Sequence, residues 1–433
     1  MKICVHGIGY IGLATAALFA NNGHDVVGYD PDEKLVEELR AGNPRTTEDD
    51  LREYVLDALD EDFEPSNEVV EADCHIICVP TPYEEESKRA DLSYVEMAGQ
   101  TVAEHLREGD MVILESTVPP GTTEEVLAPI LAAAELTPGR DFSLSHCPET
   151  VLPGNIAHEL VHNDRIIGGI DDESTDKTIA LYDPLVEGTI HRAPDATTAE
   201  FVKLSQNAYR DVNIAFANEL ARVAADYGIS SRDAIDLANV HPRVDILNPG
   251  PGVGGHCLPI DPWFLGQFSD SLNLIESARR VNDGMIDFVI ELLEDELSSL
   301  ENADIAVLGV AYKGNVDDAR HSPGLRLVER LTTMEPREVG AAAADGGQTR
   351  ACGSVRVHDP HVESDESSDI DIVDLETALD GADAVVVCAG HDAFCDINPA
   401  EAADLMDGRV IVDSFSILDA VTWREHGFDY AAI

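Results

Sequence analysis

A glycine-rich turn between a short strand and a helix opens the chain and constrains its fold more than any other feature. Residues 2–6 are apolar enough for a strand, Gly7-Ile-Gly-Tyr-Ile-Gly12 follows, and an alanine-rich helix is predicted over 11–21. A second predicted strand, 25–29, ends at an aspartate. The glycines permit a tight turn that brings a pyrophosphate to the helix N-terminus, and the acid accepts hydrogen bonds from a ribose diol. The spacing predicts a dinucleotide-binding β-α-β unit whose contacts are Gly7, Gly9, Tyr10, Ile11, Gly12 and Asp30.

The acid at the end of the second strand also bears on the choice of cofactor. Asp32 and Glu33 follow Asp30 closely, and together these carboxylates would repel the 2′-phosphate of NADP. Lys34 adds one positive charge to the same segment. We expect NAD as the cofactor.

Strand and helix patterns alternate at both ends of the chain and stop in the middle. Further apolar strands are predicted over 74–79, 111–114, 304–310, 355–358, 384–388 and 409–413. Such alternation predicts parallel sheets with helices on both faces. The predicted fold class is α/β, with two Rossmann-like parallel-sheet domains, 1–192 and 301–433, joined by a central helical domain, 193–300. An Ala- and Gly-rich stretch, 336–354, is expected to be a flexible surface insertion.

The helical pattern over 196–227 has two different sides. Apolar side chains recur at helical spacing along one side, at Phe201, Ala208, Val212, Ala215, Phe216 and Val223. Lys203, Asn207 and Arg210, spaced i, i+4, i+7, fall on the opposite side. Because the whole chain has only six lysines, we interpret Lys203 as a functional residue rather than as part of a solvated surface.

A loop rich in glycine and proline, 250–264, surrounds one cysteine, Cys257, and places Asp261 four positions later. Glycine lets the backbone approach a ligand closely, and proline restricts the loop before the ligand arrives. A nucleophilic thiol needs such access, whereas an inert buried thiol does not. A plain surface turn that happens to contain a cysteine is the alternative explanation.

Polar and basic residues follow the ends of several predicted strands, where ligands bind in open α/β sheets. Thr81 and Thr117 follow two strands of the first domain and are expected to contact the cofactor, unless they only form turns. Tyr312, Lys313 and Arg320 follow the first strand of the last domain. Because cations are rare in this chain, Lys313 and Arg320 indicate an anionic ligand such as a diphosphate.

The formal net charge of -56 excludes some partners and indicates an environment. A nucleic-acid backbone would be repelled, so we expect no nucleic-acid partner. Concentrated salt would relieve the self-repulsion, which indicates halophilic adaptation to a saline cytoplasm. No apolar run is long enough to cross a membrane, no signal peptide is evident, and the eight cysteines form no C-x-x-C pair. We expect a cytoplasmic protein with no membrane partner and no metal site.

Taken together, these motifs are similar to those of the UDP-glucose/GDP-mannose 6-dehydrogenase family, in the same order and across nearly the whole chain. Beyond the glycine-rich loops, the resemblance extends to segments 163–169, 209–220 and 241–244. It implies an NAD-dependent enzyme, expected to be a homodimer, that oxidises C6 of a UDP-sugar twice to give a uronate. The expected substrate is UDP-N-acetyl-D-mannosamine, with UDP-N-acetylglucosamine or UDP-glucose as alternatives.

The resemblance also implies roles for individual residues. Cys257 would attack the aldehyde formed in the first oxidation, and the thiohemiacetal would be oxidised to a thioester that water hydrolyses. Catalytic roles in proton transfer, oxyanion stabilisation or water activation are implied for Lys203, Asn207, Asp261, Thr117 and Glu149. Residues implied to hold the sugar and diphosphate are Thr150, Val151, Lys203, Asn207, Arg210, His241, Arg243, Gly254, Tyr312 and Lys313. Arg320 is implied as a cofactor contact.

Two positions depart from the family pattern. Thr150 stands where a cation would contact substrate, which bears on sugar preference or affinity. Ile260 stands where the UDP-glucose enzymes carry lysine, which favours an N-acetylated sugar. A non-catalytic NAD-binding scaffold is an alternative, but it has no need of Cys257, Lys203, Asn207 and Asp261 together. A two-electron hydroxyacid dehydrogenase is another, but it needs neither Cys257 nor the last domain.

Overall fold

The computed structural model describes residues 1–433 except 47, 152–153, 270, 334–351 and 364–369. The chain forms two compact units. Unit 1 comprises Met1–Gln206 and Asp261–Ser271, and unit 2 comprises Asn207–Ile260 and Leu272–Ile433. Most of the predicted insertion, 336–354, lies outside the described residues. The domain limits 1–192, 193–300 and 301–433 remain a prediction.

Unit 1 contains a sheet in which the described strands follow the order β10-β9-β8-β7-β4-β1-β2-β3. Their bounds are β1 Lys2–His6, β2 Asp25–Tyr29, β3 Phe63–Ser66, β4 Cys74–Ile77, β7 Met111–Leu114, β8 Ser143–His146, β9 Arg165–Gly169 and β10 Ile190–Arg192. From β3 to β8 all neighbours are parallel, in the strand order of a doubly wound nucleotide-binding fold.

The edge of this sheet differs from the prediction of a wholly parallel arrangement. β9 pairs antiparallel with β8, through Ser145 with Gly169 and His146 with Gly168. β10 then pairs parallel with β9. An antiparallel edge strand on an otherwise parallel sheet is common. An antiparallel neighbour needs no crossover connection, whereas a parallel neighbour does.

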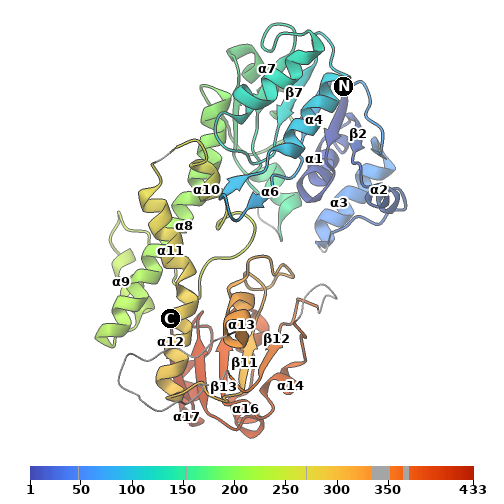
Figure 1. Cartoon of the computed structure of the whole chain (residues 1–433). Helices are drawn as coiled ribbons and strands as arrows, with labels where there is room; N and C mark the ends of the chain where they lie inside the picture. The colour runs from blue at the N-terminus through green and yellow to red at the C-terminus, as the bar shows by residue number, and fades with distance from the viewer. Residues whose placement is uncertain (47, 152–153, 270, 334–351, 364–369) are drawn as a thin grey trace. The chain divides into compact units, whose positions relative to one another are not determined.

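Helices cover both faces of the unit 1 sheet (Figure 1). The described helices of unit 1 are α1 Tyr10–Ala20, α2 Glu33–Arg40, α3 Asp49–Asp60, α4 Ser93–Ala103, α5 Ala128–Leu131, α6 Ile156–His162, α7 Asp172–Tyr182 and α10 Asp261–Leu265, with a π-helix at Thr122–Leu127 and a 3-10 turn at Ala132–Ala134. A hairpin joins β5 Tyr83–Glu84 to β6 Arg89–Ala90. Ile76 packs in the core that contains Leu18 of α1, whereas Ile77 packs in the core that contains Val102 of α4. The alternating direction of strand residues explains why this strand is apolar throughout.

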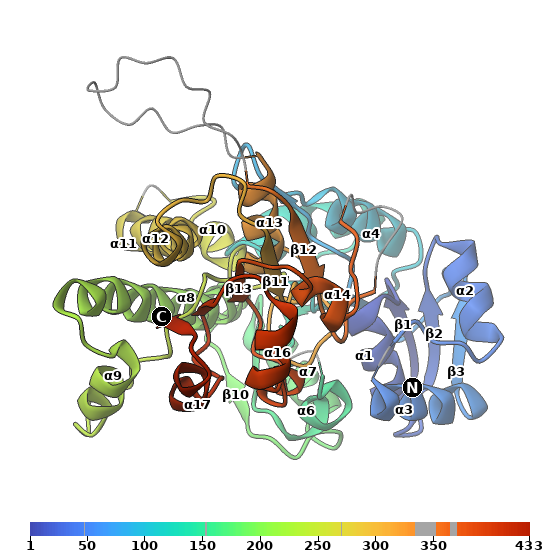
Figure 2. The same ribbon diagram turned by 90° about the horizontal axis from the view of Figure 1, so that it is seen from below.

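Unit 2 contains a parallel sheet with the strand order β12-β11-β13-β14-β15, visible in Figure 2 beside α14 and α16. The strands are β11 Ile305–Leu308, β12 Val355–His358, β13 Ala384–Val387, β14 Val410–Asp413 and β15 Asp429–Ala432. The helices are α9 Ser231–Asn239, α11 Asn273–Asp283, α12 Met285–Leu297, α13 Pro323–Thr333, α14 Leu375–Leu379, α15 Asp392–Cys395, α16 Pro399–Leu405 and α17 Ala420–Glu425. Val307 and Leu308 point into the two opposite cores of this sheet.

The α/β fold class predicted from the sequence is confirmed, and the element bounds agree closely. The strands predicted over 2–6, 25–29, 111–114 and 355–358 have the observed limits. The helix predicted over 11–21 spans Tyr10–Ala20, and the strand predicted over 74–79 ends at Ile77. None of the described helices is long and apolar enough to cross a membrane.

Helix α8, Ala196–Tyr227, has an unusual distribution of burial. On the predicted apolar side, Ala208 and Ala215 are buried, but Phe201 and Phe216 are 52% and 50% exposed. On the opposite side Lys203 is only 7% exposed. An apolar stripe ordinarily marks the buried side of a helix, so α8 leaves large apolar side chains uncovered in the single chain.

Candidate active site

The turn between β1 and α1 has close backbone packing that requires glycine. Gly7 has a φ of +85°, and a Cβ on Gly12 would lie 1.8 Å from the Gly7 carbonyl oxygen. The Ile8 N–H donates to Asp30 Oδ2 (3.1 Å), which holds this carboxylate beside the turn. Gly9 precedes α1 and offers no capping side chain, so the first N–H groups of the helix suit an anion. The predicted cofactor residues Gly7, Gly9, Tyr10, Ile11, Gly12 and Asp30 thus share one edge of the sheet.

The loops that follow β4 and β7 are joined by hydrogen bonds. Thr81 Oγ1 donates to the Thr117 carbonyl oxygen (2.8 Å), and Ser116 Oγ donates to the Val79 carbonyl oxygen (2.7 Å). β4 and β7 are parallel neighbours of β1, so both loops leave the sheet at the edge that carries the glycine turn. The structure therefore brings Thr81 and Thr117 together at this edge.

Glu115 is a buried carboxylate that the sequence reasoning did not select. It accepts hydrogen bonds from Thr15 Oγ1 (2.8 Å) and the Tyr182 hydroxyl (2.5 Å), and Arg165 Nη1 lies 3.7 Å away. Burial, and then the charge of Glu115, raise the pKa of Tyr182 well above its usual value. Since Thr15 lies on α1, the carboxylate ties the cofactor helix to β7. The sequence contained a signal for this pair: Glu115 directly follows the apolar strand β7, and Arg165 begins β9. A charge buried beside such strands requires a partner.

Lys203 of α8 contacts the segment that follows β8. Its Nζ donates to the Glu149 carbonyl oxygen (2.8 Å) and lies 3.2 Å from Glu149 Oε1. Both side chains are nearly buried. The other carboxylate oxygen of Glu149 accepts from the Val151 N–H (2.7 Å), and Thr150 Oγ1 donates to the Asp164 carbonyl oxygen (3.3 Å). The predicted residues Glu149, Thr150, Val151 and Lys203 therefore form one group, while Leu152 and Pro153 lie outside the described residues.

Glu200, one turn before Lys203, was also missed from the sequence. Its oxygens accept hydrogen bonds from the Gly121 N–H (2.5 Å), the Thr123 N–H (2.7 Å) and Thr123 Oγ1 (2.6 Å). Burial raises the pKa of Glu200 to about 7, against these hydrogen bonds, which lower it. The contacts fasten the loop that carries Thr117 to α8. An acid on the same helix side as Lys203 was the only signal.

Asp261 begins α10 and is 4% exposed. The segment that it opens packs on the β5–β6 hairpin of unit 1. Lys88 Nζ lies 4.0 Å from the centre of the Trp263 ring, and the Ala90 N–H donates to Gln267 Oε1 (2.7 Å). The hairpin therefore positions the aspartate that follows the cysteine loop.

The Cys257 loop packs against the turn after β11 within unit 2. The Gly255 N–H donates to the Arg320 carbonyl oxygen (2.9 Å). A Cβ on Gly255 (φ +85°) would lie 2.9 Å from the Tyr312 ring, and one on Gly254 would lie 3.0 Å from Tyr312 Cβ. Cys257 itself is exposed. Two glycines thus let the tyrosine lie directly beside the backbone that presents the thiol.

Charged residues surround Tyr312. Burial first, then Asp318 and Cys257, raise its pKa to about 12, while Arg320 and Arg210 act in the opposite direction. The Arg320 guanidinium pairs with Asp318 (2.7 Å), and Lys313 Nζ lies 5.7 Å from the Tyr312 ring centre. Unit 2 thus gathers Cys257, Gly254, Arg210, Tyr312, Lys313 and Arg320.

Asp359 holds the backbone of the turn after β11. Its Oδ2 accepts from the Val310 N–H (2.7 Å) and the Ala311 N–H (2.9 Å), and His391 Nε2 lies 3.2 Å away. Burial acts to raise its pKa, but hydrogen bonds from His391 and the backbone lower it well below the usual range. This arrangement repeats that of Asp30 in unit 1, since each acid follows the strand beside a glycine turn.

A buried polar network connects α8 to the start of the cysteine loop. Asp211 Oδ1 accepts from Arg279 Nη1 (2.6 Å) and Asn282 Nδ2 (2.8 Å). Asn218 Nδ2 donates to Asn282 Oδ1 (2.9 Å), and Asn218 Oδ1 accepts from the Gly250 N–H (2.9 Å). The network was not predicted, although Asp211 and Asn218 lie in the segment 209–220 that carried the resemblance.

His241 and Arg243 are both exposed in the turn after α9. The Arg243 N–H donates to His241 Nδ1 (3.3 Å). This contact lies within the turn itself, and the role of both residues in substrate binding stays a prediction. Asn207 lies on α8 one turn beyond Lys203.

Three models of the UDP-glucose/GDP-mannose dehydrogenase family match the chain in succession. The NAD binding domain matches residues 1–186, the central domain matches 197–284, and the UDP binding domain matches 306–420. Together they span most of the sequence, and their order follows the groups of residues described above.

Similar proteins match over nearly their whole length. UDP-N-acetyl-D-mannosamine dehydrogenase of Methanocaldococcus jannaschii is 40% identical, over 99% of this chain and 95% of that protein. NDP-N-acetyl-D-galactosaminuronic acid dehydrogenase of Ralstonia nicotianae is 37% identical, over 95% of each. The solved structure of the UDP-D-ManNAc dehydrogenase from Pyrococcus horikoshii is 40% identical, with a TM-score of 0.89 over 100% of this chain and 99% of the other.

Proposed function

The chain belongs to the UDP-glucose/GDP-mannose dehydrogenase family and is an NAD-dependent UDP-sugar dehydrogenase, and on that basis we propose that it oxidises C6 of UDP-N-acetyl-D-mannosamine to the carboxylate. The similarity to named UDP-N-acetyl-D-mannosamine dehydrogenases over 99% of the chain carries the choice of sugar. Ile260, in place of the lysine of the UDP-glucose enzymes, supports an N-acetylated substrate.

The residues at the edge of the unit 1 sheet fit NAD. The glycine turn leaves backbone room for a pyrophosphate, and Asp30 beside it suits a ribose diol rather than a 2′-phosphate. When bound, NAD accepts one hydride in each of the two oxidations. Glu115 and Thr15 hold the helix that follows the turn.

Cys257 is the proposed nucleophile. Its exposed thiolate adds to the carbonyl carbon of the aldehyde, and the aldehyde oxygen takes a proton to give a thiohemiacetal. Loss of a hydride and a proton from the thiohemiacetal carbon and hydroxyl gives a thioester. Water then adds to this carbon, the C–S bond breaks, and the thiol and the carboxylate are released. The covalent bond also prevents the aldehyde from leaving between the two oxidations.

Lys203 is the proposed stabiliser of the oxygen that gains charge in these steps. Its contacts with Glu149 hold the ammonium group in one position. Asn207, on the same helix side, adds a neutral donor, and Thr117 and Asp261 are proposed to orient the water. Tyr312, Lys313, Arg210, Gly254, His241 and Arg243 are proposed to hold the sugar nucleotide, with Thr150 and Val151 beside the sugar and Arg320 at the cofactor.

Counting NADH per sugar tests both the chemistry and the sugar. The protein is given UDP-N-acetyl-D-mannosamine, UDP-N-acetylglucosamine and UDP-glucose separately in concentrated KCl. Two NADH with the mannosamine compound alone support the proposal. Two NADH per molecule of another sugar would reject the proposed substrate. One NADH per sugar would reject the thioester route, and no NADH with any of the sugars would reject the proposed reaction.

The protein is further proposed to be a homodimer formed through its central helices. In unit 2, large apolar side chains are at least 45% exposed on two successive helices, at Tyr209, Phe216, Val223, Tyr227, Leu237 and Val240. Large apolar side chains left exposed on successive helices are typical of a protein interface, and a second copy supplies a surface of matching chemistry. Sedimentation in concentrated KCl should give a dimer that Phe216→Glu dissociates and the exposed Met97→Glu on α4 does not. A monomeric wild-type protein would reject this assembly.

A further inference from the structure

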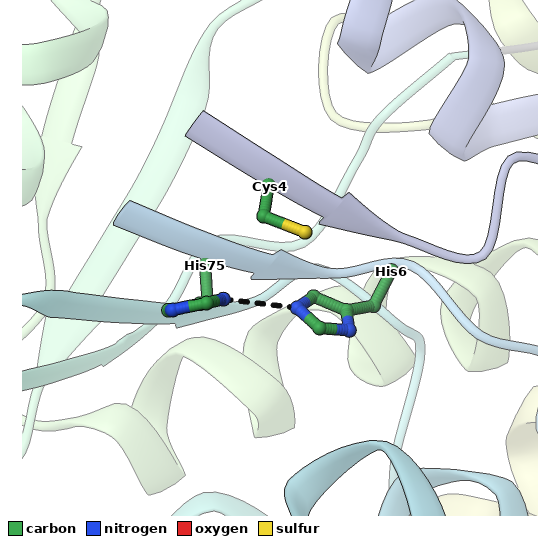
Figure 3. A group of neighbouring side chains, drawn as sticks. All are labelled: Cys4, His6 and His75. Atoms are coloured by element: carbon green, nitrogen blue, oxygen red, sulfur yellow. Dashed lines mark hydrogen bonds between the residues drawn. The ribbon is translucent and has the colours of Figure 1, made fainter. Parts of the chain in front are cut away.

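Three side chains of metal-binding type meet inside unit 1. Cys4 and His6 lie on β1, and His75 lies on β4, where it pairs with Cys4 in the parallel register. Each is at most 1% exposed, and one possible ligand atom from each lies within 4.8 Å of the other two. In Figure 3 the Cys4 thiol lies near the His6 and His75 rings, and a hydrogen bond joins the two rings. The three donors thus converge at one buried point.

The two histidines are poorly explained as ordinary core residues. His6 Nε2 lies 3.0 Å from His75 Nδ1, so one ring donates to the other. Within the described residues, the remaining nitrogens, His6 Nδ1 and His75 Nε2, have no hydrogen-bond partner. Burying a polar atom without a hydrogen-bond partner destabilises the folded state. Apolar residues at these positions would avoid that cost, as they do on either side of them at Val5 and Ile76.

The three groups are in protonation states suited to coordination. Burial lowers the pKa of His6 well below its usual value and that of His75 to about 4, so both rings are neutral and carry a lone pair at neutral pH. Burial raises the pKa of Cys4 to about 11, so its thiol would release a proton to solvent as an ion binds.

We propose that Cys4, His6 and His75 form a binding site for one soft closed-shell metal ion, Cu⁺ or Zn²⁺. Two imidazole nitrogens and one thiolate are donors that such ions prefer, whereas Mg²⁺ and Ca²⁺ take oxygen donors. Bonds of about 2.0–2.3 Å bring neighbouring ligand atoms to within about 4 Å of one another, so the observed group needs only small side-chain movements. The site is independent of the reaction proposed above.

Charge and coordination number favour Cu⁺ over Zn²⁺ at this site. One thiolate neutralises Cu⁺ but leaves Zn²⁺ with a net positive charge in a buried site. Zn²⁺ also requires a fourth ligand, whereas the group found among the described residues has three members.

The position of the site connects it to the cofactor turn. His6 is the last residue of β1 and directly precedes Gly7. An ion bound there would join β1 to β4 within the sheet, next to the turn. Ion binding to the folded state should therefore raise the melting temperature.

The test is a titration of the purified, metal-free full-length protein without oxygen. Cu⁺ is added against a chromophoric chelator, and Zn²⁺ is added in a separate arm against its own chelator. We expect one equivalent bound per chain, a thiolate-to-metal absorption band in the ultraviolet, and an X-ray absorption spectrum with one sulfur and two nitrogen neighbours. Tighter retention of Cu⁺ assigns the site to copper, and tighter retention of Zn²⁺ assigns it to zinc.

Variants decide whether these side chains hold the ion. Cys4→Ser and His75→Gln should each lower the affinity at least about 100-fold, since even loss of a group that only hydrogen-bonds to a metal ligand costs about 10–100-fold. Cys74→Ser, a buried thiol next to His75 that packs in the opposite core, should keep the ion, and so should Cys257→Ser. NAD binding and circular dichroism verify that each variant folds. Wild-type protein that binds neither ion, or Cys4→Ser protein that binds as tightly as wild type, overturns the proposal.

Discussion

The ammonium group of Lys203 contacts Glu149 at two points, its main-chain carbonyl oxygen at 2.8 Å and its carboxylate Oε1 at 3.2 Å. The pair is almost buried. A lysine held at two points has little rotational freedom, so its charge is directed before substrate arrives. The other carboxylate oxygen holds the Val151 N–H, so the same acid also orients the segment proposed to bind the sugar.

Removing the Lys203 ammonium should lower kcat strongly. Lys203→Ala is expected to reduce kcat about 10²–10³-fold, because a directed donor to the developing oxyanion is lost. Glu149→Gln should give a smaller loss, since the carbonyl contact remains. The matched control is Lys177→Ala on α7, where the lysine is exposed and pairs with Glu173. Unchanged kcat in Lys203→Ala, measured by NADH formation, would contradict the proposed role.

Replacing the proposed nucleophile should stop turnover without affecting the cofactor. Cys257→Ser is expected to lower NADH formation on the order of 10³-fold or more, because a serine hydroxyl is a much poorer nucleophile than a thiolate. NAD affinity, followed by fluorescence titration, should stay at the wild-type value. Cys395→Ser removes another exposed thiol, on α15, and should be fully active. Full activity in Cys257→Ser would reject the thioester route.

The buried pair of Asp211 and Arg279 should contribute strongly to stability. Among the described residues, Asp211→Asn leaves the nearly inaccessible Arg279 charge with Asp283 as its one acidic partner, and the expected loss in free energy of unfolding is about 3 kcal/mol. Asp283→Asn is the matched control, because its carboxylate contacts the same arginine but is 48% exposed. It should cost less than about 1 kcal/mol. Equal losses in urea unfolding would show that burial of the pair does not matter.

Glu200 should make stability depend on pH in a defined window. Its pKa is raised to about 7 in the folded protein, above the value near 4.5 expected when unfolded, so the folded state binds the extra proton between these values. Protonated Glu200 therefore stabilises the folded state fully below about pH 4.5. This stabilisation, roughly 3 kcal/mol, is lost as the pH rises through about 7.

Glu200→Gln removes this titration. The difference in free energy of unfolding between wild type and variant should therefore change between about pH 4.5 and about pH 7. Glu219→Gln, an exposed acid on the same helix, should leave the pH dependence unchanged. If the free energy of unfolding of Glu200→Gln depends on pH as strongly as that of wild type, groups other than Glu200 cause the pH dependence.

Salt should stabilise this chain through screening. With a net charge of -56, the folded state is under strong self-repulsion. Between about 0.1 and about 1 M KCl the Debye length falls from about 10 Å to about 3 Å, and the melting temperature should rise. Sucrose, which is excluded from surfaces but does not screen charge, serves as the control for general stabilisation. A melting temperature that is flat or falls with KCl would contradict halophilic adaptation.

The residues found from the sequence share one property. Gly7, Gly12, Asp30 and Cys257 lie in local patterns whose spacing is itself the signal, and the helical spacing of Lys203 identified one side of α8. Glu115, Glu200 and Asp211 were missed because each acts through partners far along the chain. Glu200 contacts a loop 77 and 79 residues earlier, and Asp211 contacts residues 68 and 71 positions later. Their local sequence gives at most a weak signal: Glu115 follows an apolar strand, and Glu200 lies on the same side of α8 as Lys203.

The sequence by itself determined the elements with the clearest local periodicity: the strands named in the sequence analysis, the glycine turns and the α/β class, whereas β3, β8, β9, β10 and β15 were not predicted. The predicted elements follow from short-range sterics and the alternation of apolar residues, which are encoded within a few positions. Only the tertiary structure decided which carboxylates are buried, and that α8 covers its lysine and exposes its phenylalanines. It alone placed Cys4 opposite His75, because strand order and register depend on packing summed over whole sheets and not on any single segment.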